Sequence, residues 1–196
     1  GLVDGAGDDF YKAHIWGQGV AYWWAFGFLE DHAGNDQYSA IQYSRAGTAH
    51  MGVASFVDLM GDDQYNQDQR ASGGVIGAAR DASLSTFIDG GGDDLYYLGR
   101  GAAGQGNLNG MGMFWDRYGN DEYASRKVTK PHLNSFGYAT SVDVFFPSYR
   151  RDMPTAAYYL DTHGKDVYRY GQPAKEGQVL PPLVASNNAT WTTDHG

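Results

Sequence analysis

The chain has 196 residues, of which 28 are Gly and 15% are aromatic, and its net charge is −9. Because a Gly inside a helix costs about 1 kcal/mol relative to Ala, this composition argues against a helical protein and favours turns and closely packed strands. The negative charge argues against nucleic acid or an anionic membrane as the main partner, and no apolar run reaches the roughly 18 residues of a membrane-spanning helix.

An eight-residue motif, Asp-x-x-Gly-x-Asp-x-Tyr, occurs six times along the chain. The first Asp recurs after 27, 27, 31, 27 and 45 residues, so the basic period is 27. Repetition at a fixed period is the sequence signature of stacked repeat architectures. We place a small insertion near 79–83 and a larger, irregular one at about 124–155. In chain order the copies span 4–11, 31–38, 58–65, 89–96, 116–123 and 161–168.

The residues before each motif follow a strand-like pattern. A large apolar residue stands two positions before the first Asp, as Leu29 and Phe56 do, and a small residue stands four positions before it, as Gly27 and Ala54 do. In a strand these positions share one face with the Asp. We therefore expect an inward-facing small and large side chain on a strand that runs into the Asp turn, with the Tyr beginning the next strand.

A period of 27 fits the coil of a parallel β-helix. Propeller blades need about 40 residues and helical repeats about 33, and the chain has no leucine-rich pattern. Coils stack at about 4.8 Å, so identical turns lie above one another, and the motif Gly is expected at positive φ. We predict an all-β fold, a parallel β-helix or β-roll-like solenoid of about six 27-residue coils over residues 1–170. Residues 171–196, rich in Pro and polar residues, are predicted to form a strap or linker, and a β-sandwich is the alternative fold.

Stacked turns would bring many carboxylates together. The turns hold 15 of the 23 acidic residues, and two like charges about 4 Å apart repel by about 4 kcal/mol at a surface-like dielectric. Since the chain has no Cys, oxygen ligands dominate, and Ca²⁺ is the predicted counter-ion. The alternative is a metal-free turn in which each Asp caps its own backbone, and Lys165 favours this alternative in the last copy. The predicted ligands are the two motif aspartates of each copy: Asp4, Asp9, Asp31, Asp36, Asp58, Asp63, Asp89, Asp94, Asp116, Asp121, Asp161 and Asp166.

The turn motif resembles the nonapeptide calcium-binding repeats of hemolysin-type secreted toxins and proteases, Gly-Gly-x-Gly-x-Asp-x-apolar-x. Residues 89–96 and 4–11 match best. The resemblance implies that the second Asp of each copy is a side-chain Ca²⁺ ligand and that the Tyr points into the core. The chain departs from the family because the first Gly is Asp, the second Gly survives only as Gly5 and Gly90, and the coil is longer.

Two other groups of residues stand outside the motif. Trp16, Trp23, Trp24 and Trp115 are expected to fill the core, with a sugar-stacking platform as the alternative. The 124–155 insertion is basic and could dock an acidic glycan or the acidic edge of a neighbour, or it could be a solvated loop. Its charged residues include Arg126, Lys127, Lys130, His132, Arg150 and Arg151.

The sequence contains no nucleophile motif, phosphate loop or nucleotide fingerprint, so we predict no catalytic or cofactor-binding residue.

These patterns favour a non-catalytic structural or interaction module that is extracellular, periplasmic or on the cell surface, because a Ca²⁺ site of this kind would be empty in the cytosol. A protein partner or self-assembly is expected, since the first copy has no evident cap and solenoids need caps. The alternative is a carbohydrate-active β-helix enzyme such as a polysaccharide lyase, with Lys130, Arg150 or Arg151 as candidate base. Neither a nucleic-acid partner nor membrane insertion is expected.

Overall fold

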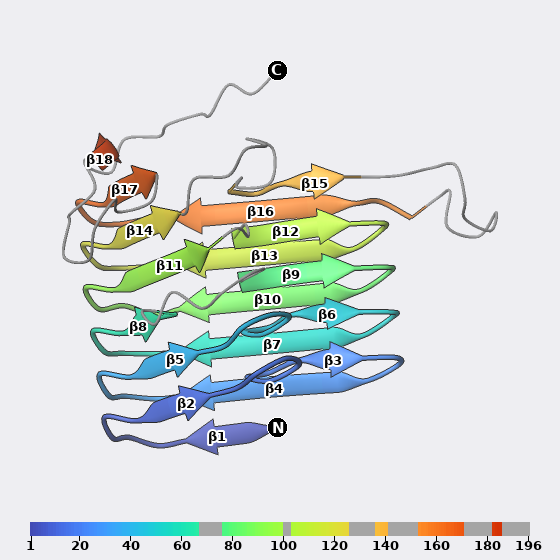
Figure 1. Cartoon of the computed structure of the whole chain (residues 1–196), viewed down its shortest axis with the longest axis horizontal. Coiled ribbons are helices and arrows are strands. Elements are labelled where there is room, and N and C mark those ends of the chain that lie inside the picture. The colour runs from blue at the N-terminus through green and yellow to red at the C-terminus, as the bar shows by residue number, and fades with distance from the viewer. Residues whose placement is uncertain (67–75, 100–102, 126–135, 141–152, 171–181, 186–196) are drawn as a thin grey trace.

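The structure, a computed structural model, describes residues 1–66, 76–99, 103–125, 136–140, 153–170 and 182–185. These residues contain eighteen strands and no helix that could cross a membrane. The strands form three sheets that rise together along one axis (Figure 1). The predicted class, an all-β solenoid with parallel strands, is confirmed.

The first sheet contains the strand that precedes each motif copy. Its strands are all parallel, and neighbours in the sheet come from successive coils. The register places the first Asp of each copy opposite the next, for example Asp58 opposite Asp31 and Asp89. The six strands are β1 (Leu2–Asp4), β4 (Phe26–Asp31), β7 (Val53–Asp58), β10 (Leu84–Asp89), β13 (Met111–Asp116) and β16 (Ala156–Asp161).

The second sheet contains the motif Tyr, as predicted, and its register aligns these tyrosines from coil to coil. Its pairs are parallel except for the last one, in which β18 runs antiparallel to β17. Part of the predicted C-terminal strap therefore adds a strand to the solenoid. The seven strands are β2 (Phe10–Lys12), β5 (Gln37–Ser39), β8 (Gln64–Tyr65), β11 (Leu95–Gly99), β14 (Glu122–Ser125), β17 (Val167–Tyr170) and β18 (Pro182–Ala185).

The third sheet completes each coil and has five strands. Within the described residues no third-sheet strand follows the last motif copy, so the coil count is slightly below the predicted six. The strands are β3 (Ala21–Tyr22), β6 (Thr48–Ala49), β9 (Ile76–Arg80), β12 (Ala103–Asn107) and β15 (Ala139–Thr140).

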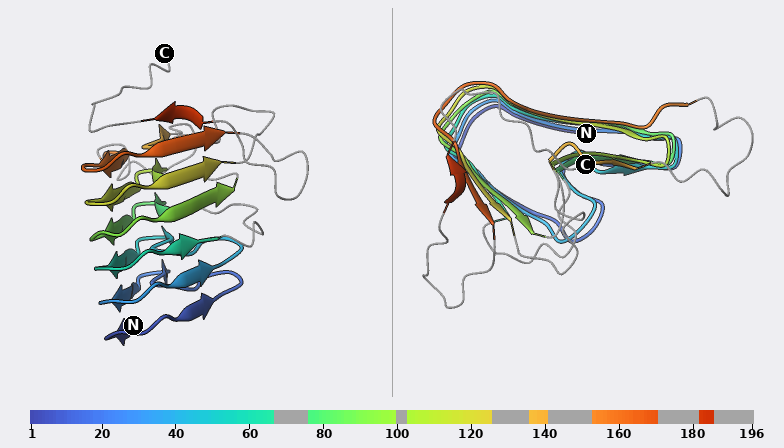
Figure 2. Two further views of the ribbon diagram at one scale, coloured as in Figure 1. Left: turned by 90° about the vertical axis from the view of Figure 1, so that its left-hand side faces the viewer. Right: turned by 90° about the horizontal axis from the view of Figure 1, so that it is seen from above.

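The first and third sheets lie close together, whereas the second sheet diverges from the corner at the motif turn (Figure 2). Their approach requires small residues, because a Cβ on Gly27 would lie 1.8 Å from the carbonyl oxygen of Val20, and one on Gly112 would lie 2.0 Å from that of Gln105. The closely approaching walls that the small inner residues predicted are therefore present.

Two aromatic stacks fill the wider space between the first and second sheets. The six motif tyrosines stack along the axis with ring centroids 4.7 to 5.1 Å apart. A parallel stack runs through Phe56, Phe87, Phe114 and Tyr159, the large residues two positions before the Asp. The predicted inward direction of both sets is confirmed, and the coils are held together by rings as well as by strand pairing.

The structure corrects the position of both insertions. Thr48 pairs with Ala79, so 79–83 belongs to a strand and turn that recur in each coil, and the extra residues of the third coil lie between Tyr65 and Ile76. The 124–155 segment is not one irregular insertion, because β14 extends to Ser125 and β15 pairs with β12. Extra residues lie on both sides of β15, and the basic residues predicted for this segment fall outside the described ranges.

Candidate metal centre

The motif turn joins the first sheet to the second, and its Gly permits the turns to stack. The φ of Gly61 is +150° and that of Gly92 is +155°, a region that is essentially restricted to Gly. A Cβ on Gly92 would lie 1.6 Å from the carbonyl oxygen of Gly61 in the preceding coil. The predicted positive φ is confirmed, and the close approach of successive turns explains why only Gly occupies this position.

The first Asp of each motif faces the interior because it ends a strand whose alternate residues point inward. From the second to the fifth copy it is buried, and its Oδ2 accepts a hydrogen bond from a motif Tyr hydroxyl. Asp89, in the middle of the row, accepts from both Tyr65 and Tyr96, at 2.7 and 2.9 Å. The other bonds run from Tyr11 to Asp31, Tyr38 and Tyr65 to Asp58, Tyr123 to Asp116 and Tyr168 to Asp161.

The second Asp of each motif connects one coil to the previous one. The backbone N–H of Asp36 donates to Oδ1 of Asp63 at 2.7 Å, and the N–H of Asp63 donates to Oδ1 of Asp94 at 2.7 Å. The same bond recurs at every step of the row, at 2.6 to 3.1 Å. This ladder occupies one oxygen of each second Asp after the first copy.

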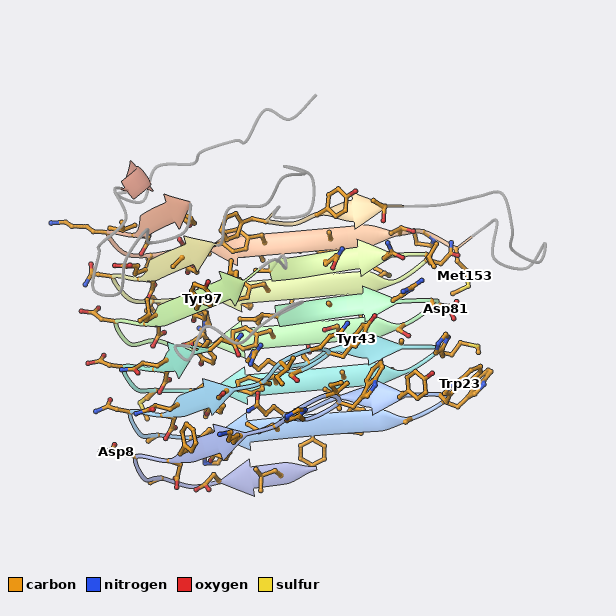
Figure 3. The ribbon with its side chains drawn as sticks, viewed as in Figure 1. Asp8, Trp23, Tyr43, Asp81, Tyr97 and Met153 are labelled. Carbon is orange, nitrogen blue, oxygen red and sulfur yellow. The ribbon has the colours of Figure 1, made fainter. Side chains whose placement is uncertain are left out.

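The residue between the motif Gly and the second Asp forms a separate, exposed outer row. Here the bonds run in the opposite direction, since the N–H of Asn35 donates to Oδ1 of Asp8 and the N–H of Asp62 donates to Oδ1 of Asn35. Figure 3 shows Asp8 on the outer side of the turn. The 15 acidic residues therefore divide into twelve motif aspartates and three solvated ones, Asp8, Asp62 and Asp93.

Among the motif aspartates, all of which lie in the described part of the chain, five buried carboxylate oxygens have no hydrogen-bond partner after these bonds are made. The predicted alternative, an Asx-turn, accounts only for Oδ1 of Asp4, Asp31 and Asp89, which accept the N–H two residues on. Because a buried polar atom without a partner is costly, these oxygens are the part of the turn that backbone capping leaves unexplained. They are Asp36 Oδ2, Asp58 Oδ1, Asp63 Oδ2, Asp116 Oδ1 and Asp121 Oδ2.

The same aspartates form four groups of three, in each of which one oxygen per residue lies within 4.8 Å of the others. Opposite ligands of a Ca²⁺ ion are separated by about 4.6 to 5.2 Å, so the spacing suits an oxygen-coordinated cation. Every group includes at least one unpartnered oxygen, so buried aspartates could hold a metal ion in each. The groups are Asp31, Asp36 and Asp58; Asp63, Asp89 and Asp94; Asp94, Asp116 and Asp121; and Asp121, Asp161 and Asp166.

No basic side chain neutralises these groups in the part of the chain that the structure describes. The ion pairs found there join His32 to Glu30 and His50 to Asp81, and neither involves a motif Asp. Burial, with repulsion from neighbouring carboxylates, raises the pKa of Asp36 to about 6 and that of Asp63 to about 7. Burial likewise raises the pKa of Asp116 well above its ordinary value. The turns thus disfavour several ionised carboxylates at once unless a cation joins them.

Ten of the twelve predicted ligands fall in these groups. Asp4 and Asp9 do not, because they lie in the first coil, where both are only half-buried and only one neighbouring turn contacts them. Lys165 belongs to the exposed outer row, so it does not remove Asp161 and Asp166 from the fourth group.

The prediction that the tryptophans fill the core is wrong, since none of Trp16, Trp23, Trp24 and Trp115 belongs to the buried core. Trp23 is 54% exposed and Trp24 is 77% exposed, because they form the turn between β3 and β4. Trp16 and Trp115 are partly exposed. A signal was available in the sequence, since Trp23 and Trp24 lie outside the small and large alternation that marks the buried strand.

Comparisons of the chain with protein-family models, with curated proteins and with solved structures give no match. The candidate site is therefore defined by the chain's own geometry. Its defining features are the stacked Gly turns, the two carboxylate rows and the unpartnered oxygens between them.

Proposed function

We propose that the chain is a non-catalytic structural or interaction module whose stacked aspartate turns bind Ca²⁺ outside the cytosol. The observation that carries this proposal is the set of five buried, unpartnered carboxylate oxygens, which belong to the four aspartate groups. Leaving an ionised carboxylate buried and unpaired costs several kcal/mol. One cation in each group would remove that cost and would join successive coils.

The ligand chemistry supports Ca²⁺ over other metals. The groups offer carboxylate oxygens only, with neither His nor Cys, and Ca²⁺ accepts about six to eight oxygens in flexible geometry. Mg²⁺ demands shorter, near-octahedral contacts, and Zn²⁺ prefers nitrogen and sulfur. The resemblance to the hemolysin-type nonapeptide repeats agrees with this choice.

The proposed location of the module rests on the affinity that is typical of extracellular Ca²⁺ sites. Extracellular Ca²⁺ modules bind with dissociation constants of about 10⁻⁴ to 10⁻³ M, concentrations found outside the cytosol but not within it. We therefore place the module in the extracellular space, in the periplasm or at a cell surface.

A protein partner or a further copy of the chain is part of this proposal. The net charge of −9 disfavours nucleic acid as the main partner.

Calorimetric titration of the chelator-treated protein with Ca²⁺ tests the metal. We expect saturable binding of several ions per chain, and a rise in Tm that Mg²⁺ at the same concentration does not reproduce. An absence of both heat and Tm change at about 10 mM Ca²⁺, tenfold above the weakest extracellular sites, would rule out the metal-binding turns.

An assay for Ca²⁺-dependent cleavage of acidic polysaccharides tests the non-catalytic character. We expect no product, and turnover would favour the polysaccharide lyase alternative. The base candidates of that alternative, Lys130, Arg150 and Arg151, lie outside the described residues, so no structural observation favours it.

A further inference from the structure

The edge opposite the motif turns carries a compact aromatic cluster. It extends from the segments that precede β3 and β6 to the turns at which the third sheet returns to the first, and we define it as the aromatic corner: Trp16, Tyr22, Trp23, Trp24, Tyr43 and His50. Figure 3 shows Trp23 projecting from this edge, with Asp81 at the same edge two coils further along and Asp8 on the opposite side of the molecule. The corner shares no residue with the aspartate groups.

The backbone at this turn does not explain the choice of tryptophan. Trp23 and Trp24 have φ values of +56° and +51°, a left-handed region that bulky side chains rarely adopt. Gly and Asn adopt this region more readily than tryptophan does. Folding alone would therefore select smaller residues here.

Solvent exposure shows that packing does not explain them either. Tyr22, Trp23 and Trp24 are 45%, 54% and 77% exposed, and among the described residues Trp24 contacts no other ring. Three consecutive aromatic side chains that stay in water forgo the burial that makes such residues stabilising in a core. Rim-exposed aromatic groups of this kind mark a binding surface.

Five of the six rings pack against one another. Trp23 stacks on His50 with ring centroids 4.5 Å apart and planes 20° apart, and Tyr22 lies nearly perpendicular to both rings. Trp16 stacks on Tyr43 at 4.5 Å and lies 4.5 Å from Tyr22. These five rings are thus positioned before a ligand arrives, which lowers the entropic cost of binding, and Trp24 extends beyond them into solvent.

A polar pair borders this apolar surface. His50 Nδ1 is hydrogen-bonded to the carboxylate of Asp81, and the two side chains are 30% and 11% exposed. His50 stacks on one face of Trp23, so the opposite face of that indole remains available. A ligand on that face would lie across the indole from His50, so its hydrogen-bonding groups would meet the polar atoms of the exposed rings themselves, the Trp24 indole N–H and the Tyr22 hydroxyl.

We infer that the aromatic corner binds carbohydrate. A pyranose ring has an apolar face of C–H groups, which stacks on an indole, and a rim of hydroxyl groups, which hydrogen-bond to neighbouring polar side chains. A purely apolar ligand would desolvate the indole N–H of Trp24 and the hydroxyl of Tyr22 without offering them hydrogen-bond partners. Nucleic-acid bases also stack on aromatic rings, but the net charge of −9 opposes a phosphate backbone.

Tryptophan fluorescence and calorimetry with β-1,4-linked hexasaccharides of glucose and of N-acetylglucosamine test this inference. We expect saturable binding of at least one of the two, both in Ca²⁺ and in chelator, because the corner and the aspartate groups are separate. Trp24→Ala should weaken binding by about tenfold, the scale of one lost aromatic contact, whereas Trp24→Tyr should retain most of it. Trp24→Leu tests whether a ring is required, and it should behave like Trp24→Ala.

Trp115→Ala is the matched control, since it removes a partly exposed tryptophan from the outer face of β13 and should leave binding unchanged. Binding of neither hexasaccharide at about 10 mM, well above typical ligand affinities, would overturn the inference. So would equal losses in Trp115→Ala and Trp24→Ala, or full binding by Trp24→Leu. Association with phosphatidylcholine vesicles that depends on Trp24, without sugar binding, would assign the corner to a lipid surface instead.

Discussion

The two long edges of the solenoid differ in what repeats from coil to coil. At the motif edge, where the first sheet turns into the second, the same four residues recur in every coil and bond to their counterparts above and below. At the opposite edge the backbone repeats, with two consecutive positive φ values per turn, but the side chains do not. That edge carries Trp23–Trp24, His50–Met51, Asp81–Ala82 and Leu108–Asn109.

This difference indicates a division of roles. The buried second Asp bonds to its own copy in the neighbouring coil and is Asp in every copy, so the motif edge holds successive coils together. A turn whose conformation is kept while its residues vary is free to carry a local function. The aromatic residues of the first such turn occupy a position where stability does not select them.

The largest expected effect comes from the motif Gly. Gly92→Ala places a Cβ 1.6 Å from a carbonyl oxygen, at a φ of +155°, so we expect a loss of at least about 3 kcal/mol in the free energy of unfolding, or failure to fold. Urea unfolding measures the loss. Gly5→Ala is the control, since no atom lies within 4 Å of the Cβ it would add. Equal stability of the two variants would contradict the stacked-turn packing.

The second effect tests the metal at a shared ligand. Asp94 belongs to two of the four groups, so Asp94→Asn should remove about 2 to 3 kcal/mol of Ca²⁺-dependent stabilisation at saturating ion. In chelator the same variant should be more stable than the wild type, because it removes a buried carboxyl whose pKa burial raises to about 12. Thermal unfolding with and without Ca²⁺ measures both the loss of Ca²⁺-dependent stabilisation and the gain of stability in chelator.

The control for Asp94→Asn is Asp62→Asn, which removes the same charge from the exposed outer row. It should leave the Ca²⁺ response unchanged. If the two variants behave alike, the effect reports net charge rather than a site.

The third effect is the pH dependence of the metal-free protein. Burial raises the pKa of Asp36 and Asp161 to about 6 and that of Asp63 to about 7, above their values in the unfolded chain. The native state therefore binds more protons than the unfolded state between about pH 4 and pH 7, and each such proton lowers stability by about 1.4 kcal/mol per pH unit as the pH rises. In chelator, Tm should fall from about pH 5 to pH 8 by this linkage.

Ca²⁺ should abolish or reverse that slope, because cation binding requires ionised carboxylates and releases their protons. A Tm in chelator that rises across the same range would contradict the raised pKa values. If Ca²⁺ does not alter the slope of Tm against pH, the aspartates with raised pKa values do not bind the metal.

The smallest effect concerns the opposite edge. Replacing Trp24 by Gly should raise the free energy of unfolding by about 0.5 to 1 kcal/mol, since Gly adopts a φ of +51° without strain and the exposed indole contacts no other ring in the described residues. Chemical denaturation measures the gain, and the variant should lose most of the sugar binding inferred above. A destabilised variant would show that Trp24 serves the fold rather than a ligand.

Much of the fold could be predicted because its information is local and repeated. Period, strand position and the inward direction of Phe56, Tyr65 and Asp58 follow from alternation around one motif, and copies that agree with one another reinforce the inference. The insertions were misplaced because gaps between motif copies give their length but not which of three strands they interrupt. Only the pairing of Thr48 with Ala79 locates the first of them.

The residues of the candidate site could be predicted from the sequence, but their hydrogen bonds could not. Sequence pointed to twelve aspartates as ligands, and ten of them meet in groups. It could not show that, after the first copy, Tyr hydroxyls occupy one oxygen of each first Asp and N–H groups of the previous coil occupy one oxygen of each second Asp. Those bonds join residues in different coils, and they decide which oxygens remain for a cation.

By itself, the sequence determined the coil period, the buried faces of the strands and the stacking of one acidic turn upon another, because each depends on short-range alternation and on a Gly that no other residue can replace. The tertiary structure decided the rest: which carboxylate oxygens stay unpartnered, where β15 and β18 join the solenoid, and that Trp23 and Trp24 face solvent. The physical reason is that these hydrogen bonds and this burial depend on contacts between coils, where residues far apart in the chain become neighbours.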